Sequence, residues 1–220
     1  MPPIFADRRD AGRRRAAALA AYAGRPDVVV LGLPRGGVPV AHEVARALGV
    51  PFDVFVVRKV GVPGHEELAM GAIASGGVRV ENPELMHQLG VDAAAFDRVV
   101  EREARELERR EALYRQGTPF PDLHGRTVLL VDDGLATGAT MRAAVQALRL
   151  HGPARIVVAV PTAAAETCDR FAREVDDIVC ATTPEPFYAV GLWYADFTAT
   201  SDEEVVALLD EERRRVGTAT

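Results

Sequence analysis

The chain has 220 residues, of which 48% are hydrophobic and 26% charged, as in an ordinary globular protein. Its net charge of -6 at pH 7 argues against a nucleic-acid partner, because phosphate backbones require a concentrated basic face. No apolar run approaches the roughly 20 residues that span a bilayer. We therefore expect a cytoplasmic protein with no membrane partner.

The first structural signal is the segment AAALAAYA, residues 16–23. It lacks the strongly apolar centre of a signal peptide, and it continues into Gly24, Arg25 and a strand-like run. We interpret it as an amphipathic helix.

Apolar strands and helices then alternate along the chain. The β-branched run DVVVLGL, residues 27–33, is followed by a PRGG turn and by Val40, Val44 and Leu48 at helical spacing. Further strands are predicted at residues 53–57, 127–131, 155–160 and 177–181. Continuous apolar strands separated by helices indicate an α/β fold, with an open, mostly parallel twisted sheet and helices on both faces.

One long segment interrupts this alternation. A helix is predicted from Asp92 to Gln116, capped by the aspartate and dense in Arg and Glu. Pairs such as Glu106 with Arg110 are typical of a solvated helix. The alternative is a helix that packs on a partner subunit, and we expect a homo-oligomer, in the simplest case a dimer.

The chain holds two cysteines, Cys168 and Cys180. They form no CxxC motif and have no neighbouring histidines at a zinc-binding spacing. We expect two buried or half-buried thiols.

The strongest chemical signal is VLLVDDGLATGAT, residues 128–140, where an apolar strand runs into Asp132, Asp133 and a loop of small residues. Ligands of parallel sheets bind beyond the carboxyl ends of the strands. A helix that begins with small residues presents its backbone amides to an anion. Residues 136–140 therefore predict a phosphate-binding loop, with two threonine hydroxyls as further donors.

Other phosphate-binding motifs fit this segment poorly. A Walker loop needs a lysine where Ala139 precedes Thr140, and no GxGxxG fingerprint is present. A phosphatase with an Asp-x-Asp pair would need an acid at Val131. The remaining alternative is a capped helix start without a ligand.

VDDGLATGAT resembles the phosphoribosyl pyrophosphate (PRPP) signature of the type I phosphoribosyltransferases. The resemblance implies that Asp132 and Asp133 approach the ribose 2- and 3-hydroxyls, directly or through Mg²⁺ and water. It makes PRPP the cosubstrate and Mg²⁺ the cofactor, with the two aspartates as metal ligands. The residues that it assigns to the 5-phosphate are Ala136, Thr137, Gly138, Ala139 and Thr140.

Two further segments resemble parts of the same family. LPRGG resembles the pyrophosphate loop, in which Arg35, Gly36 and Gly37 let backbone amides approach the leaving group. VRKVGVPGHEELAMGAIA, residues 57–74, resembles the stem and flexible lid that close on the reaction.

Within this predicted lid, Arg58 and Lys59 lie at the base, and Lys59 is the only lysine among 26 basic residues. A compact ammonium suits a pyrophosphate that is reached by a moving loop. Glu67, with His65 and Glu66 beside it, could supply a catalytic proton acceptor, or the three side chains could simply be solvated.

The resemblance extends from Phe5 to Val206 and implies a type I phosphoribosyltransferase fold with a long inserted helix and a small hood. We expect one domain over residues 1–220, with the insertion at about 82–117 and the C-terminal cap at about 184–212. Aromatic side chains of the cap either stack on a planar base or close the core. They are Phe187, Trp193 and Tyr194.

The implied reaction is a Mg²⁺-dependent transfer of the 5-phosphoribosyl group from PRPP to a nitrogenous acceptor, such as a purine or pyrimidine base, with release of pyrophosphate. This would place the protein in nucleotide metabolism. The alternative is a non-catalytic PRPP or nucleotide-binding regulatory protein.

Overall fold

The computed structural model describes residues 3–217, without the side chains of Glu66, Glu67 and Val216. Its contacts group the chain into two compact units. The sheet unit takes in the chain up to Val54, Leu123–Gly138 and the chain from Pro153 onward, and the hairpin unit takes in Phe55–Asp122 and Ala139–Gly152. A single domain with an insertion at 82–117 therefore stays a prediction.

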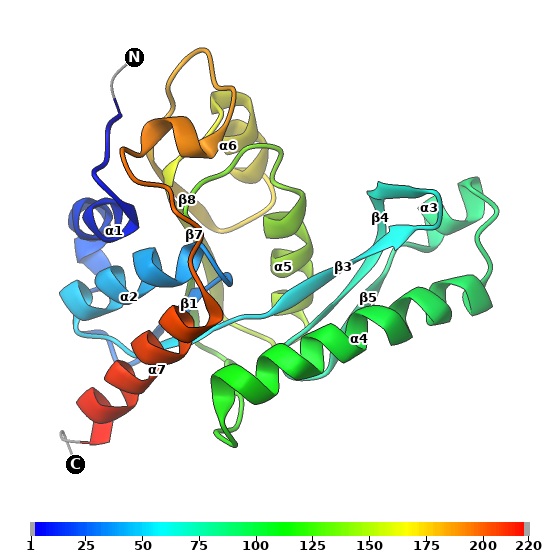
Figure 1. Ribbon diagram of the computed structural model, residues 1–220, viewed down its shortest axis with the longest axis horizontal. Coiled ribbons are helices and arrows are strands. Elements are labelled where there is room, and N and C mark those ends of the chain that lie inside the picture. Colours follow the sequence, from blue (N-terminus) through cyan, green and yellow to red (C-terminus); the bar gives the residue numbers. More distant parts are fainter. Residues whose placement is uncertain (1–2, 218–220) are drawn as a thin grey trace. The chain divides into compact units, whose positions relative to one another are not determined.

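The sheet unit is built on five parallel strands in the order β2-β1-β6-β7-β8. Every residue of β1 and β6 is buried, which explains their continuous apolar sequences. The strands are β1 (Val28–Gly32), β2 (Phe52–Val54), β6 (Thr127–Val131), β7 (Arg155–Thr162) and β8 (Asp177–Thr182) (Figure 1). The predicted α/β fold with a parallel sheet is confirmed.

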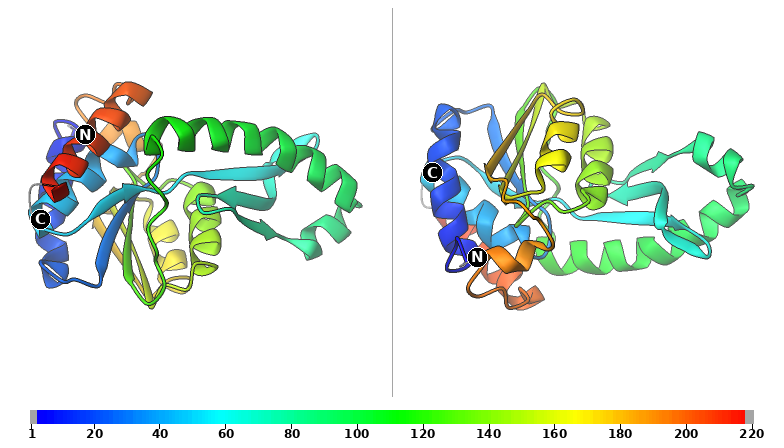
Figure 2. Two further views of the ribbon diagram at one scale, coloured as in Figure 1. Left: turned by 90° about the horizontal axis from the view of Figure 1, so that it is seen from below. Right: turned by 90° about the horizontal axis from the view of Figure 1, so that it is seen from above.

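Helices cover both faces of this sheet. Helices α1 and α2 pack on each other and contact β7 and β1, respectively, while Figure 2 shows α6 on the opposite face. The helical elements of the sheet unit are α1 (Arg8–Ala16), η1 (Ala17–Tyr22), α2 (Gly37–Leu48), α6 (Ala165–Phe171), η2 (Val190–Trp193) and α7 (Asp202–Gly217).

The N-terminal helix differs from the sequence-based prediction. The α-helix begins earlier, where Asp7 caps α1 by accepting a hydrogen bond of 2.7 Å from the amide of Asp10. The predicted amphipathic helix at 16–23 is instead mostly the 3₁₀ helix η1. Its buried residues, Leu19 and Tyr22, lie three positions apart, which matches the period of a 3₁₀ helix.

The hairpin unit contains three antiparallel strands in the order β3-β4-β5. Residues 57–74 thus form a β-hairpin, in which the register shifts next to Gly61 and Val62 pairs with His65 around a turn with Gly64 at φ +78°. The bounds in this unit are β3 (Val57–Val62), β4 (His65–Ala74), β5 (Val78–Glu81), α3 (Pro83–Gln88), α4 (Ala93–Arg115) and α5 (Ala139–Arg149). The strand predicted at 53–57 is divided between β2 and β3.

Helix α4 agrees with the prediction for residues 92–116. Asp92 caps it by accepting from the amide of Ala95 at 2.6 Å, and Arg110 pairs with Glu106 at 2.6 Å. Its buried side chains include Phe96 and Tyr114, and the helix contacts β3 and β4. The apolar face is thus covered within the hairpin unit, and a homo-oligomer stays a prediction.

The expectation of two thiols is wrong, because Cys168 and Cys180 form a disulfide between α6 and β8. The chain returns from the helix to the neighbouring strand, which brings together two residues 12 positions apart. Within residues 3–217, no helix has the length and apolarity needed to cross a membrane.

Helix α2 buries an ionisable side chain, that of His42. The residue is 5% exposed, its ring meets Phe52 edge to face at 5.9 Å, and its Nε2 lies 3.7 Å from Glu211 Oε2 of α7. Burial lowers the pKa of His42, and the Glu211 carboxylate opposes this shift only in part. The unfolded chain therefore binds this proton at a higher pH than the folded chain.

We accordingly expect stability to fall as the pH is lowered through the ordinary histidine pKa of about 6.5, because the unfolded state takes up the proton first. Thermal unfolding between pH 7.5 and 5 should show a slope that His42→Gln reduces. His87→Gln, at an exposed histidine of α3, is the matched control and should leave the slope intact. An identical slope in all three proteins would contradict this assignment.

Candidate functional site

Two adjacent carboxylates lie at the carboxyl end of β6. Asp132 and Asp133 follow Val131 directly, and the amide of Asp133 donates to Asp132 Oδ1 at 2.8 Å. Burial raises the pKa of both carboxyl groups, and the neighbouring charge of Asp133 raises the pKa of Asp132 further. Both side chains are half-buried, and the pair is therefore a partly desolvated negative centre that a cation or hydroxyl donors would stabilise.

Asp133 is held by side chains from both ends of the chain. Arg8 Nε donates to Asp133 Oδ2 at 2.8 Å, and its Nη1 donates to the carbonyl of Thr198 at 2.7 Å. The guanidinium lies 3.9 Å from the centre of the Phe197 ring. The Tyr194 hydroxyl donates to the backbone carbonyl of Asp133 at 2.5 Å. These contacts fix the position of Asp133 before any ligand binds.

The sequence did not single out Arg8 or Tyr194 for this role. Arg8 is one of several arginines in FADRRDAGRRR, and 125 positions separate it from Asp133. Burial raises the pKa of Tyr194, so its hydroxyl remains a donor.

The PRGG turn after β1 packs directly on the acid pair. A Cβ at Gly36 would collide with Asp133 Oδ2, and a Cβ at Gly37 would lie 2.7 Å from the carbonyl oxygen of Val131. Both positions therefore require glycine. The Pro34–Arg35 peptide is cis. The structure thus brings together two predicted segments, the PRGG loop and the acid pair.

The side chain of Arg35 extends from this turn. It is 44% exposed, and its Nη1 lies 3.9 Å from Asp202 Oδ1 of α7.

The predicted phosphate loop follows the acid pair. Among the residues that the structure describes, none accepts a hydrogen bond from the amides of Ala136, Thr137 and Gly138. Gly138 has φ +75°, a left-handed conformation that favours glycine. Ala139 and Thr140 then begin α5. Unpaired amides that lead into a helix start can bind an anion.

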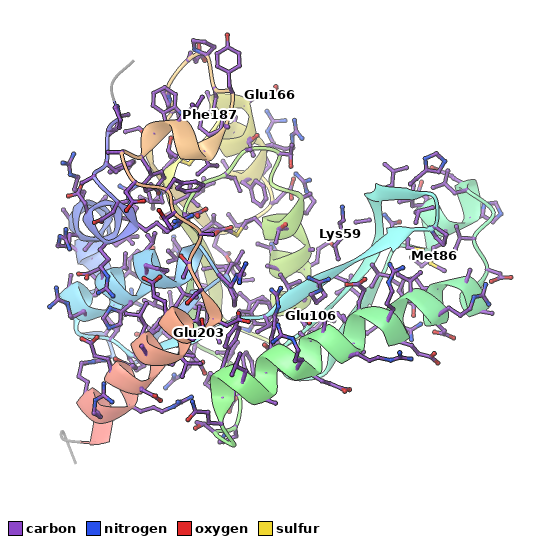
Figure 3. The ribbon with its side chains drawn as sticks, viewed as in Figure 1. Lys59, Met86, Glu106, Glu166, Phe187 and Glu203 are labelled. Atoms are coloured by element: carbon purple, nitrogen blue, oxygen red, sulfur yellow. A yellow bond between two sulfur atoms is a disulfide. The ribbon has the colours of Figure 1, made fainter. Side chains whose placement is uncertain are left out.

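The predicted lid residues belong to the hairpin unit. Arg58 Nε and Nη2 donate to Glu103 Oε2 of α4 at 3.0 and 2.6 Å. Lys59 is the next residue of β3, and side chains alternate along a strand, so it extends to the other face of the strand (Figure 3). Glu67 is part of β4, and its side chain lies outside the described residues.

The aromatic residues of the cap form a core. Trp193 and Tyr194 are 5% and 4% exposed and cluster with Phe5 and Ala11. Phe187 stacks on Trp193 with 6.2 Å between ring centres. For Trp193 and Tyr194 the structure thus supports the core alternative rather than stacking on a base.

The acid pair has the donor chemistry of a magnesium site. Among residues 3–217, no group of three or more His, Cys, Asp and Glu side chains could hold a metal ion by itself. Magnesium is commonly bound by one or two carboxylates, with phosphate oxygens and water completing its shell. The two aspartates fit this pattern, in which the ligand would supply the remaining oxygens.

Several known proteins are similar to this chain. A candidate phosphoribosyl transferase of Mycobacterium tuberculosis (strain ATCC 25618 / H37Rv) is 52% identical over 211 residues, which are 96% of this chain and 47% of that protein. The Bifunctional protein PyrR of Chloroflexus aurantiacus is 36% identical over 130 residues, 57% of this chain and 65% of that protein. The chain spans about half the length of the mycobacterial relative.

A solved structure has the same fold. The crystal structure of TT1426 from Thermus thermophilus matches with a TM-score of 0.86 and 45% identity, covering 96% of this chain and 99% of that chain. The family model described as phosphoribosyl transferase domain matches residues 7–189. The sequence match and the geometry at the end of β6 lead to the same conclusion: the chain belongs to the phosphoribosyl transferase domain family.

Proposed function

We propose that this protein is a Mg²⁺-dependent phosphoribosyltransferase that moves the 5-phosphoribosyl group of PRPP to a nitrogenous acceptor and releases pyrophosphate. One observation carries the proposal: a half-buried acid pair packs on a glycine turn and is followed by a loop of unpaired amides. This arrangement offers carboxylates to the ribose of PRPP. It also offers backbone donors to the 5-phosphate and to the pyrophosphate on the two sides of that sugar.

In the proposed complex, the 5-phosphate accepts hydrogen bonds from the loop Ala136–Thr140, where the start of α5 adds a favourable dipole. Asp132 and Asp133 face the ribose hydroxyls. The backbone of Arg35–Gly37 faces the pyrophosphate. Magnesium, when bound, would neutralise charge on the departing pyrophosphate.

The transfer breaks the bond between ribose C1 and the pyrophosphate oxygen and forms a bond from C1 to the acceptor nitrogen. Positive charge develops on the sugar as the old bond lengthens, and the acceptor nitrogen loses a proton. Half-buried carboxylates stabilise such charge because they are already oriented and only partly solvated. Arg8 and Tyr194 contribute by fixing Asp133.

The roles of Arg58, Lys59 and Glu67 in this proposal come from the sequence resemblance. The two cations would stabilise the leaving group, and Glu67 would take the acceptor's proton, with His65 and Glu66 as the alternatives. We further propose that the protein acts in the cytoplasm, in nucleotide metabolism, as a dimer.

A screen for pyrophosphate release with PRPP, Mg²⁺ and individual nucleobases tests the reaction and identifies the acceptor. PRPP binding without release from any base would favour the regulatory alternative.

Neutralising the acid pair tests the central residues. We expect Asp132→Asn combined with Asp133→Asn to weaken PRPP binding or turnover about tenfold or more, equivalent to ~1.4 kcal/mol. The loss arises because the side-chain amides of asparagine accept weaker hydrogen bonds from sugar hydroxyls than carboxylates do. They also bind Mg²⁺ poorly. Equilibrium binding and pyrophosphate release provide the measurement.

The matched control replaces two adjacent aspartates at the opposite end of the sheet, Asp176→Asn with Asp177→Asn, of which Asp177 is the first residue of β8. This variant should bind PRPP like the wild type. If the variant with Asp132→Asn and Asp133→Asn also behaves like the wild type, the assignment of these two residues is wrong.

Lys59 provides a separate test. We expect Lys59→Ala to lower turnover about tenfold or more while PRPP affinity changes about threefold or less, because the ammonium is proposed to act on charge that develops at the leaving group. Lys59→Arg keeps the charge and should lose less. Equal losses in turnover and affinity for Lys59→Ala would indicate plain ground-state binding.

A further inference from the structure

The phosphate loop rests on helix α6 through two contacts. The Thr167 hydroxyl donates to the backbone carbonyl of Ala136 at 2.6 Å, and Thr167 is 5% exposed. A Cβ at Gly138 would lie 2.5 Å from Phe171 Cε2 and 3.2 Å from Thr167 Cγ2, so the backbone of the loop lies directly against the helix. Both helix residues belong to the sheet unit, as do Ala136, Thr137 and Gly138.

The hydrogen bond from Thr167 also determines the direction of an amide that faces the proposed anion. The Ala136–Thr137 peptide is trans, so its carbonyl and its N–H point in opposite directions. Because the carbonyl points toward α6, the N–H of Thr137 points away from it. Thr137 is exposed, and its amide has no acceptor among the described residues.

Helix α6 has little intrinsic stability. It has seven residues, and its N-terminus has no side-chain cap. Helices of this length are marginal without tertiary contacts. The residue next to Thr167 is Cys168, which the disulfide links to Cys180 of β8. This covalent link fixes α6 to the edge strand β8 through the helical turn that contains Thr167.

We propose that Thr167 is a positioning residue for the phosphate loop, and that the Cys168–Cys180 disulfide holds it there, so that affinity for a 5-phosphate depends on the redox state of this pair. The identity of the anion rests on the function proposed above. A dithiol such as dithiothreitol reduces the S–S bond by two electrons and two protons, giving two thiols, and is itself oxidised to a cyclic disulfide. Disulfides of cytosolic proteins are often redox-sensing.

The first experiment compares two ligands by calorimetry on the oxidised protein. Ribose 5-phosphate probes the loop, and pyrophosphate probes the PRGG turn. Thr167→Val should weaken the binding of ribose 5-phosphate about fivefold, the equivalent of one hydrogen bond of ~1 kcal/mol. It should change the affinity for pyrophosphate less than about twofold. Thr167→Ser retains the donor and should restore binding.

Thr127→Val is the matched control. Thr127 is also buried, at 3% exposure, and its hydroxyl donates to Asp27 Oδ2 at 3.0 Å at the opposite end of β6. The Thr127→Val variant should bind both ligands like the wild type. If Thr167→Val weakens both ligands equally, or Thr167→Ser fails to restore ribose 5-phosphate binding, Thr167 is not a positioning residue for the loop.

The redox part is tested on the same samples. Dithiothreitol should weaken ribose 5-phosphate binding of the wild type and leave pyrophosphate affinity within about twofold, since only the loop is released. Cys168→Ser with Cys180→Ser should bind like the reduced protein and not respond to dithiothreitol. Equal affinity of the oxidised and reduced wild type for ribose 5-phosphate would overturn the redox dependence.

Hydrogen exchange separates this inference from the proposed function. If the oxidised wild type binds neither ligand, the proposed function fails, but the coupling between α6 and the loop can still be measured. Exchange at the amides of Ala164 and Cys168, which donate to the carbonyls of Leu135 and Ala164 at 3.0 Å, should accelerate in Thr167→Val and in the reduced protein. Unchanged exchange in both would overturn the coupling without reference to any ligand.

Discussion

The partial removal of two adjacent carboxylates from water at the end of β6 is the constraint on which the site depends. Burial disfavours the charged form of both groups, and Asp133 adds repulsion at Asp132. Arg8 offsets part of this cost at Asp133 through a 2.8 Å ion pair. Gly36 and Gly37 are required because the PRGG turn approaches the pair too closely for any side chain. The remaining negative charge is what the proposed sugar and metal would use.

The parts of the site that are continuous in sequence could be predicted from it. The apolar runs of β1 and β6 mark buried parallel strands, and such strands place their following loops at one edge of the sheet. The structure places the PRGG turn next to Asp132 and Asp133 at this edge. The cap of α4 at Asp92 was equally local, since the aspartate bonds an amide three residues away.

The rest of the site depends on contacts between distant segments, for which one sequence carries no local signal. Arg8 reaches Asp133 across 125 positions, and Thr167 reaches Ala136 across 31. The disulfide was missed because its pairing follows from the return of α6 to β8, not from a cysteine motif. The segment 57–74, which resembles a lid, forms a β-hairpin because β3 and β4 pair along most of their length, and its role as a lid stays a prediction.

Calorimetric titration of the purified protein with PRPP, in the presence and absence of Mg²⁺, tests the central claim most directly. The proposed site predicts binding of one PRPP per chain that Mg²⁺ strengthens, because the acid pair supplies only part of a magnesium shell and the ligand supplies the rest. Absence of binding in both conditions would contradict the account. It would mean that the acid pair and the loop after it serve a different anion.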